Sequence, residues 1–174
     1  MLWVLADRLV HYTPMANANP HHFLLQRVQP AMVGLIDGSL STLAPIFGIA
    51  FYTHKPHTAF VAGLATSIGA AISMAFSEGL SDTGELTGRG SPLRRGVITG
   101  VGTFLGGILH TLPFLITNYH AAVVAAAIVV AFELVMLAVI RWKFFATGFV
   151  RSLAAVSLGG AVIAVVGALI GSAG

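Results

Sequence analysis

The sequence predicts an all-α membrane protein with five transmembrane helices. Of its 174 residues, 56% are hydrophobic and only 9% are charged, whereas a soluble domain carries about 25% charged residues. Five apolar runs each approach the roughly 20 residues that a helix needs to cross a bilayer. We place these spans at about 31–52, 59–80, 96–117, 121–140 and 149–171.

Residues 1–30 are predicted to form a leader ahead of the first span. This segment is rich in histidine, proline and asparagine, and it includes Asp7, Arg8 and Arg27. We expect interfacial helices at 2–11 and 21–29, and Pro30 suits the first turn of a helix. The chain is therefore divided into a cytoplasmic leader or interfacial segment at 1–30 and a five-helix transmembrane domain at 31–174.

The basic residues predict the orientation of the spans. Alternate connections hold eight of the nine lysines and arginines, namely Arg8, Arg27, Arg89, Arg94, Arg95, Arg141, Lys143 and Arg151. The opposite side has only Lys55. Because basic residues accumulate in cytoplasmic loops, the N-terminus is predicted to be cytoplasmic and the C-terminus outside.

One carboxylate, Asp37, lies inside the first apolar run. A charged side chain at the centre of a membrane helix costs about 2.5–3.5 kcal/mol on insertion scales, so it normally faces a partner, water or a transported ion. At helical spacing, Asp37 shares a face with Gly34, Ser41, Ala44 and Gly48. We expect this narrow face to line a path for a cation, with Asp37 as its first ligand or as a proton carrier.

A second face of interest follows the second span and becomes acidic at its cytoplasmic end. Its members, at spacings of three and four, are Ser67, Ala70, Met74, Glu78, Asp82 and Glu85. A thioether beside carboxylates suits a borderline first-row ion such as Fe²⁺ better than Mg²⁺ or Ca²⁺. The sequence thus predicts a site for a transition-metal ion.

The predicted metal ligands are Asp37, Met74 and Glu78, with Met32 as a second thioether. Asp82 and Glu85 are predicted to collect cations at the cytoplasmic mouth. For these two acids an ordinary solvated helix end is the alternative.

Two further polar residues lie in the third and fourth apolar runs. Glu133 is predicted to be a proton carrier, a ligand, or the hydrogen-bonded partner of His110 or an arginine. His110 could bind metal or titrate, and a packed, hydrogen-bonded histidine is the alternative. Pro113 is expected to kink the third span. Asp37 and Glu133 together define the predicted proton route.

Several classes of function are excluded or disfavoured by what the sequence lacks. There are no cysteines, so disulfides, thiolate metal sites and iron–sulfur clusters are excluded. No phosphate loop, nucleophile elbow or H-E-x-x-H motif is present. The basic stripes of a nucleic-acid-binding protein are missing too. We expect no enzyme and no nucleic-acid partner.

Four segments resemble the vacuolar iron transporter (VIT) family. They are GLIDG at 34–38, GLATSIGAAISMAFSEGLSD at 63–82, LTGRGSPLRRG at 86–96 and GILHTLPFLI at 107–116. The chain is most similar to the membrane domain of bacterial membrane-bound ferritin-like iron exporters, from about Val28 to the C-terminus. In this resemblance Asp37 matches the first-span acid and Met74 matches the motif methionine of the second span.

The resemblance implies a homodimer in a bacterial inner membrane that exchanges Fe²⁺ for protons. Its ion path would lie between the subunits, lined by the first and second spans. No cofactor is expected to be permanently bound, and the transported ion would be Fe²⁺ or, as an alternative, Mn²⁺.

The chain departs from the family pattern at several points. Thr66 stands where relatives often have an acid, and Pro45 lies farther from Asp37 than the corresponding proline does in the vacuolar members. The cytoplasmic metal-collecting domain between the second and third spans is reduced to 81–95, and residues 1–30 lack paired Glu-x-x-His ligands. Either the transport core works alone, or a separate ferritin-like protein delivers iron. The alternative is a non-transporting scaffold or anchor for such a partner. Ser41, Thr66 and His110 are lower-ranked site residues.

Overall fold

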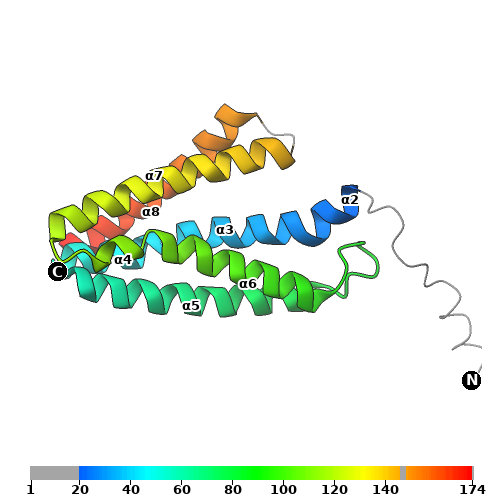
Figure 1. The fold of residues 1–174 in the computed structure, drawn as a ribbon, viewed down its shortest axis with the longest axis horizontal. Helices are drawn as coiled ribbons and strands as arrows, with labels where there is room; N and C mark the ends of the chain where they lie inside the picture. The colour runs from blue at the N-terminus through cyan, green and yellow to red at the C-terminus, as the bar shows by residue number, and fades with distance from the viewer. Residues whose placement is uncertain (1–19, 146–147, 174) are drawn as a thin grey trace, which may run out of the picture.

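The computed structural model describes residues 20–145 and 148–173, and every regular element in these ranges is a helix. The elements run along the long axis of the molecule (Figure 1). In chain order they are α2 (Pro20–Phe23), η1 (Leu24–Val28), α3 (Gln29–Ser41), α4 (Leu43–Thr53), α5 (Pro56–Ser81), α6 (Pro92–Leu109), η2 (Leu112–Leu115), α7 (Tyr119–Phe144) and α8 (Phe149–Ser172).

Four helices in the described part of the chain are long and apolar enough to cross a membrane. They are the run Leu24–Thr53, α5, α7 and α8. The chain is therefore a multi-pass, all-helical membrane protein, as predicted. The helix α6 has 18 residues and carries Arg94 and Arg95 in its first turn, and the count of five spans stays a prediction.

The predicted boundaries of the third span were wrong. The sequence predicted a helix over 96–117, but α6 begins at Pro92 and ends at Leu109, and a turn and the 3₁₀-helix η2 follow. Pro113 has no N–H to donate to the carbonyl of Leu109, and it disfavours helical geometry at the residue before it. The helix therefore ends instead of bending.

The segment predicted as an interfacial helix at 21–29 is helical, and it continues without a break into the first membrane helix. Residues 20–41 form one uninterrupted helical run, which includes the π-helical turn η1. In that turn Gln29 N–H donates to the carbonyl of Leu24, five residues back. Pro30 follows directly and cannot donate to Gln26, so the wider turn precedes the proline. The helix predicted at 2–11 lies outside the described residues.

The first membrane helix is broken at Thr42, between α3 and α4. Pro45 has no N–H for the carbonyl of Ser41, and its ring crowds that carbonyl. The Thr42 hydroxyl donates to the carbonyl of Gly38 at 2.8 Å. The break thus has a local cause in the sequence, and it places a buried hydroxyl in the middle of the helix bundle.

Glycines allow the close approach of α6 to its neighbours. A Cβ atom on Gly34 or Gly38 of α3 would collide with the backbone carbonyls of Thr99 and Thr103 on α6. On its other side α6 packs against α5, where a Cβ on Gly96 would come within 2.6 Å of the Ala75 carbonyl. Small residues at such positions let membrane helices pack backbone to backbone. The helix α6 is therefore held between α3 and α5.

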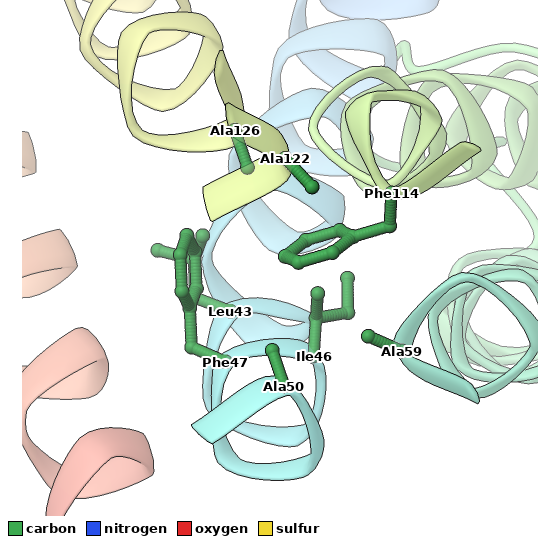
Figure 2. Close-up of a cluster of buried hydrophobic side chains, with 8 residues drawn as sticks. All are labelled: Leu43, Ile46, Phe47, Ala50, Ala59, Phe114, Ala122 and Ala126. Atoms are coloured by element: carbon green, nitrogen blue, oxygen red, sulfur yellow. The ribbon is translucent and has the colours of Figure 1, made fainter. Parts of the chain in front are cut away.

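An apolar cluster joins α4, α5, η2 and α7 at one end of the bundle (Figure 2). The Phe114 ring of η2 points between α4 and α7, and it lies edge-on to Phe47 with ring centroids 6.1 Å apart. The other members are Leu43, Ile46, Ala50, Ala59, Ala122 and Ala126. This cluster fixes η2 and thereby the end of α6.

Candidate functional site

Asp37 and Met74 line the same groove. The groove has a volume of about 450 Å³ and lies between α3, α5 and α8. Its lining is apolar except for Asp37 and Ser41; the full set is Val33, Ile36, Asp37, Leu40, Ser41, Met74 and Ile163. Asp37 and Met74 are both half-buried, and Ser41 is exposed. The structure therefore brings together the two residues predicted as the principal metal ligands.

The predicted continuous polar face of the first span is divided between different neighbours. Asp37 and Ser41 line the groove, but Gly34 faces the backbone of α6 at Thr99. Gly48 faces Gly167 of α8, with a contact of 3.3 Å for an added Cβ. The glycines of this face serve close packing against neighbouring helices. The face does not line one path along its whole length.

Two other predicted residues lie away from the groove lining. Met32 is buried, with 3% of its surface exposed, and it is not among the residues that line the groove. The Thr66 hydroxyl donates to the carbonyl of Ala62 at 2.7 Å, within its own helix. Their predicted contributions to a metal site stay predictions.

Glu78 is held by two arginines near the C-terminal end of α5. Its Oε1 atom accepts from Arg89 at 2.6 Å and from the Nε atom of Arg95 at 2.8 Å. Asp82 also pairs with both arginines, at 2.9 Å to Arg89 and 3.2 Å to Arg95. The two acids are therefore neutralised by two guanidinium groups, a pairing that the sequence patterns did not indicate. The remaining acid of the predicted mouth, Glu85, is exposed.

Arg95 is the buried centre of this ion-pair cluster. It lies in the first turn of α6, its side chain is 1% exposed, and it donates to the carbonyl of Gly90 at 3.1 Å. Gln26, from the start of the first membrane helix, donates to the carbonyl of Gly88 at 3.1 Å. These contacts fix the connection between α5 and α6 against the ends of these two helices and against the start of the first membrane helix.

The ion pairs change the acid–base behaviour of Asp82. Desolvation raises the pKa of its carboxyl. Hydrogen bonds from Arg89 and from the Gly84 backbone, with the charges of Arg95 and Arg89, together lower it by more, so the pKa falls below the usual 3.8. A depressed carboxyl pKa stabilises the fold at pH values above the unfolded pKa. That stabilisation is lost as the pH falls through the folded-state pKa.

A second polar assembly lies in the core and joins three helices. His110, the residue after α6, is fully buried, and its Nδ1 atom lies 2.9 Å from Oε2 of Glu133 on α7. Its Nε2 atom lies 2.8 Å from the Thr42 hydroxyl at the break between α3 and α4. The interpretation of Glu133 as the partner of His110, and of His110 as a packed, hydrogen-bonded residue, is therefore confirmed.

The proton positions in this assembly follow from its geometry. The Thr42 hydroxyl has one hydrogen, which it donates to the Gly38 carbonyl, so it accepts from Nε2–H of His110. One proton then lies between Nδ1 and Oε2 of Glu133. Both ring nitrogens are occupied, and His110 offers no free lone pair to a metal ion.

Neither of these polar assemblies forms a complete metal centre by itself. Within residues 20–145 and 148–173, no group of three or more histidine, aspartate or glutamate side chains is placed to hold a metal ion. The groove contributes one carboxylate and one thioether from a single chain. A full coordination shell around an ion there would need water, backbone oxygens or further side chains.

Two features of these sites had no clear signal in the sequence. The contribution of Ile163 to the groove depends on how α8 packs, which no local pattern specifies. The pairing of Glu78 with Arg89 and Arg95 joins residues 11 and 17 positions apart through an irregular connection. The arginine that follows the acidic segment in LTGRG is the only available hint.

The fold and the groove define a multi-pass membrane protein in which a carboxylate and a thioether line one groove between helices. Residues 28–87 match the model of the VIT family, and this match covers α3, α4 and α5, which carry Asp37, Met74 and Glu78. The VIT resemblance is thus confirmed over this segment, which supports membership in that family. No curated protein matches the chain, and no solved structure matches it.

Proposed function

We propose that the chain exports Fe²⁺ from the cytoplasm in exchange for protons. The observation that carries this proposal is the groove in which Asp37 and Met74 lie together. A hard carboxylate and a soft thioether favour a borderline transition-metal ion. The VIT family match suggests a membrane metal-ion transporter, and the outward direction is what the resemblance to bacterial iron exporters implies.

The metal ligands in this proposal are Asp37 and Met74, and a second copy of the chain supplies the same pair. One chain offers too few ligands for a first-row ion, and its groove is open to the outside of the bundle. A homodimer with the groove at its interface would close it and double the ligand set. The proposed location is a bacterial inner membrane.

Proton exchange provides the driving force in this proposal. Moving a dication outward against an inside-negative potential costs about 4.6 kcal/mol per 100 mV, at about 2.3 kcal/mol per charge. Two protons moving inward would cancel this electrical cost. Carboxylates suit the exchange because each binds metal when ionised and a proton when neutral. Asp37 and Glu133 are the proposed proton-carrying acids.

The first experiment measures Fe²⁺ flux into or out of liposomes that contain the purified chain, under an imposed proton gradient. The wild-type chain is expected to move Fe²⁺, and Asp37→Asn is expected to reduce the flux by about 10–100-fold, the loss typical for disturbed metal sites. Glu85→Gln removes the same charge from an exposed residue of the predicted mouth, and it is expected to reduce the flux far less than Asp37→Asn does.

The proposal is wrong if the wild-type chain moves neither Fe²⁺ nor Mn²⁺, or if Asp37→Asn transports normally. Competition between the two ions in the same liposomes distinguishes an iron exporter from a manganese exporter. If Mn²⁺ is moved and Fe²⁺ is not, the transporter class holds and the ion is Mn²⁺.

A scaffold or anchor for a ferritin-like partner is the second candidate. The neutralised Glu78 and Asp82 favour it, because their ion pairs with Arg89 and Arg95 reduce the negative charge that would attract cations. Cellular iron content with and without expression separates the two functions. An exporter lowers iron content in a manner that depends on Asp37, and a scaffold alone does not.

A further inference from the structure

The buried assembly of Thr42, His110 and Glu133 lies outside the metal groove and needs its own explanation. We propose that it is a proton-binding site, separate from the metal ligands, which carries protons that are exchanged for metal. This inference rests on the proposed function, and it assigns one part of that function to a defined pair of side chains.

Burial and geometry support a site that holds a single proton. The His110 and Glu133 side chains are 0% and 1% exposed, and 2.9 Å separates Nδ1 from Oε2. Within the described residues, Oε1 of Glu133 has no hydrogen-bond partner, and it is inaccessible to solvent. An ionised carboxylate with a bare oxygen in an apolar interior is much costlier than a neutral acid. The pair is therefore neutral in this geometry, with one shared proton.

The proton balance of the site is simple. Loss of the shared proton leaves one negative charge on the pair, and return of a proton restores neutrality. No other bond forms or breaks, since Nε2–H of His110 stays bonded to Thr42. Each chain would thus carry one proton at this site and one at Asp37.

Few other charges act on this pair. The elements packed around it are α3, α4, α5, α6, α7 and η2, and among their described residues Asp37 is the one other ionisable group away from a helix end. The remaining titratable or charged residues of these elements and of α8 lie near helix ends; they are Tyr52, His57, Glu78, Arg94, Arg95, Tyr119, His120, Arg141, Lys143 and Arg151.

Two hydrogen bonds connect the site to the helix that carries Asp37. Thr42 accepts from His110 at 2.8 Å and donates to the Gly38 carbonyl at 2.8 Å. Gly38 directly follows Asp37 in α3. The proton site is therefore hydrogen-bonded to the first membrane helix at Thr42, five residues after the proposed metal ligand Asp37. The proton site and the metal site share no side chain.

The test compares wild type, Glu133→Gln and Thr103→Ser in liposomes that contain a pH-sensitive dye. In Glu133→Gln the new amide group can still donate to Nδ1, so packing is retained, but it cannot release a proton. This variant is expected to bind Fe²⁺ as wild type does and to lose about half of the proton flux per Fe²⁺, because one of the two protons that each chain would carry is removed. Thr103→Ser is the control: it keeps a buried hydroxyl that lies outside the site, where the threonine donates to the Thr99 carbonyl, and it should behave as wild type.

Two results with Glu133→Gln would overturn the inference. One is a wild-type proton flux per Fe²⁺ with an unchanged pH profile, which would leave the pair with a packing role only. The other is loss of Fe²⁺ binding together with flux, which would make Glu133 part of the metal site. A wild-type chain that moves no metal contradicts the proposed function instead, so the two failures are distinguishable.

An infrared measurement tests the site without transport and without a variant. In wild-type chain labelled with carbon-13 glutamate, a protonated carboxyl band is expected that disappears when a rise in pH removes the shared proton. Of the other two glutamates, Glu78 is ion-paired and Glu85 is exposed. A carboxyl band that is absent, or that does not respond to pH, would contradict a proton-binding role.

Discussion

Individual buried polar side chains link the helices of this protein through hydrogen bonds and ion pairs. Thr42, His110 and Glu133 form one assembly in the core, and Arg95 forms another with Glu78 near the C-terminal end of α5. In an apolar environment each such group must keep its partner, because an unpaired buried donor or acceptor costs about 1–3 kcal/mol. These residues therefore help to specify which helices pack together and in what register along their axes.

Substitution of Thr42 tests the first of these assemblies. Thr42→Val has nearly the same shape but leaves Nε2–H of His110 without an acceptor, so we expect a loss of about 1–3 kcal/mol in unfolding free energy. Denaturation of the purified chain in mixed detergent micelles measures this loss. Thr42→Ser is the control and should lose much less. A Thr42→Val variant as stable as the wild-type chain would contradict the assigned bond.

The sequence was sufficient to identify the candidate polar residues, but it only partly predicted which side chains pair with one another. Asp37, Met74 and Glu133 stand out because each is a polar or soft side chain in an apolar run, and the His110–Glu133 pair was one of the alternatives considered. The arginine partners of Glu78 were not predicted, because the path of the irregular connection at 82–91 decides which charges meet. Local spacing contains no information about that path.

At the scale of elements, the connection between α5 and α6 is the most tightly fixed polar region. Arg95 has its guanidinium buried against Glu78, Asp82 and the Gly90 carbonyl. Gly84 and Gly90 in this connection adopt positive φ values of 79° and 70°, which glycine tolerates without strain. The connection can therefore fold back closely over the arginine.

Removal of Arg95 should loosen this region strongly. Arg95→Ala leaves Glu78 with one arginine partner and empties a buried site, and breaking such a pair typically costs about 3–5 kcal/mol. Arg94→Ala is the matched control, since Arg94 is adjacent, carries the same charge and is exposed. Hydrogen exchange of α5 and α6 should increase in the first variant only. Equal effects of both substitutions would show that the buried ion pairs contribute nothing specific.

The existence of the apolar helices was predictable, but several of their ends were not. Length and hydropathy predicted the helices of the first, second, fourth and fifth spans. The end of α6 at Leu109 depends on Pro113 and on the apolar cluster around Phe114, which is a tertiary contact. The continuous helix from Pro20 depends on a π-helical turn before Pro30, and a regular helical period does not predict such a turn.

For the whole molecule, the proposed metal site and the proposed proton site lie in different parts of one helix bundle. The groove with Asp37 and Met74 opens between α3, α5 and α8, whereas the His110–Glu133 pair is enclosed in the core. The break at Thr42 lies between them along the first membrane helix. This arrangement suits exchange of a cation for protons, because each ion has its own ligands and the two sites share a helix.

A structure of the chain with Fe²⁺ or Mn²⁺, analysed by anomalous scattering, tests the central claim most directly. The account predicts a metal peak in the groove, bonded to the Asp37 carboxylate and to the Met74 sulfur, with the same pair from a second copy completing the shell. Loss of the peak in crystals of Asp37→Asn serves as the control. An ordered metal ion elsewhere in the molecule, with none at Asp37, would contradict the account.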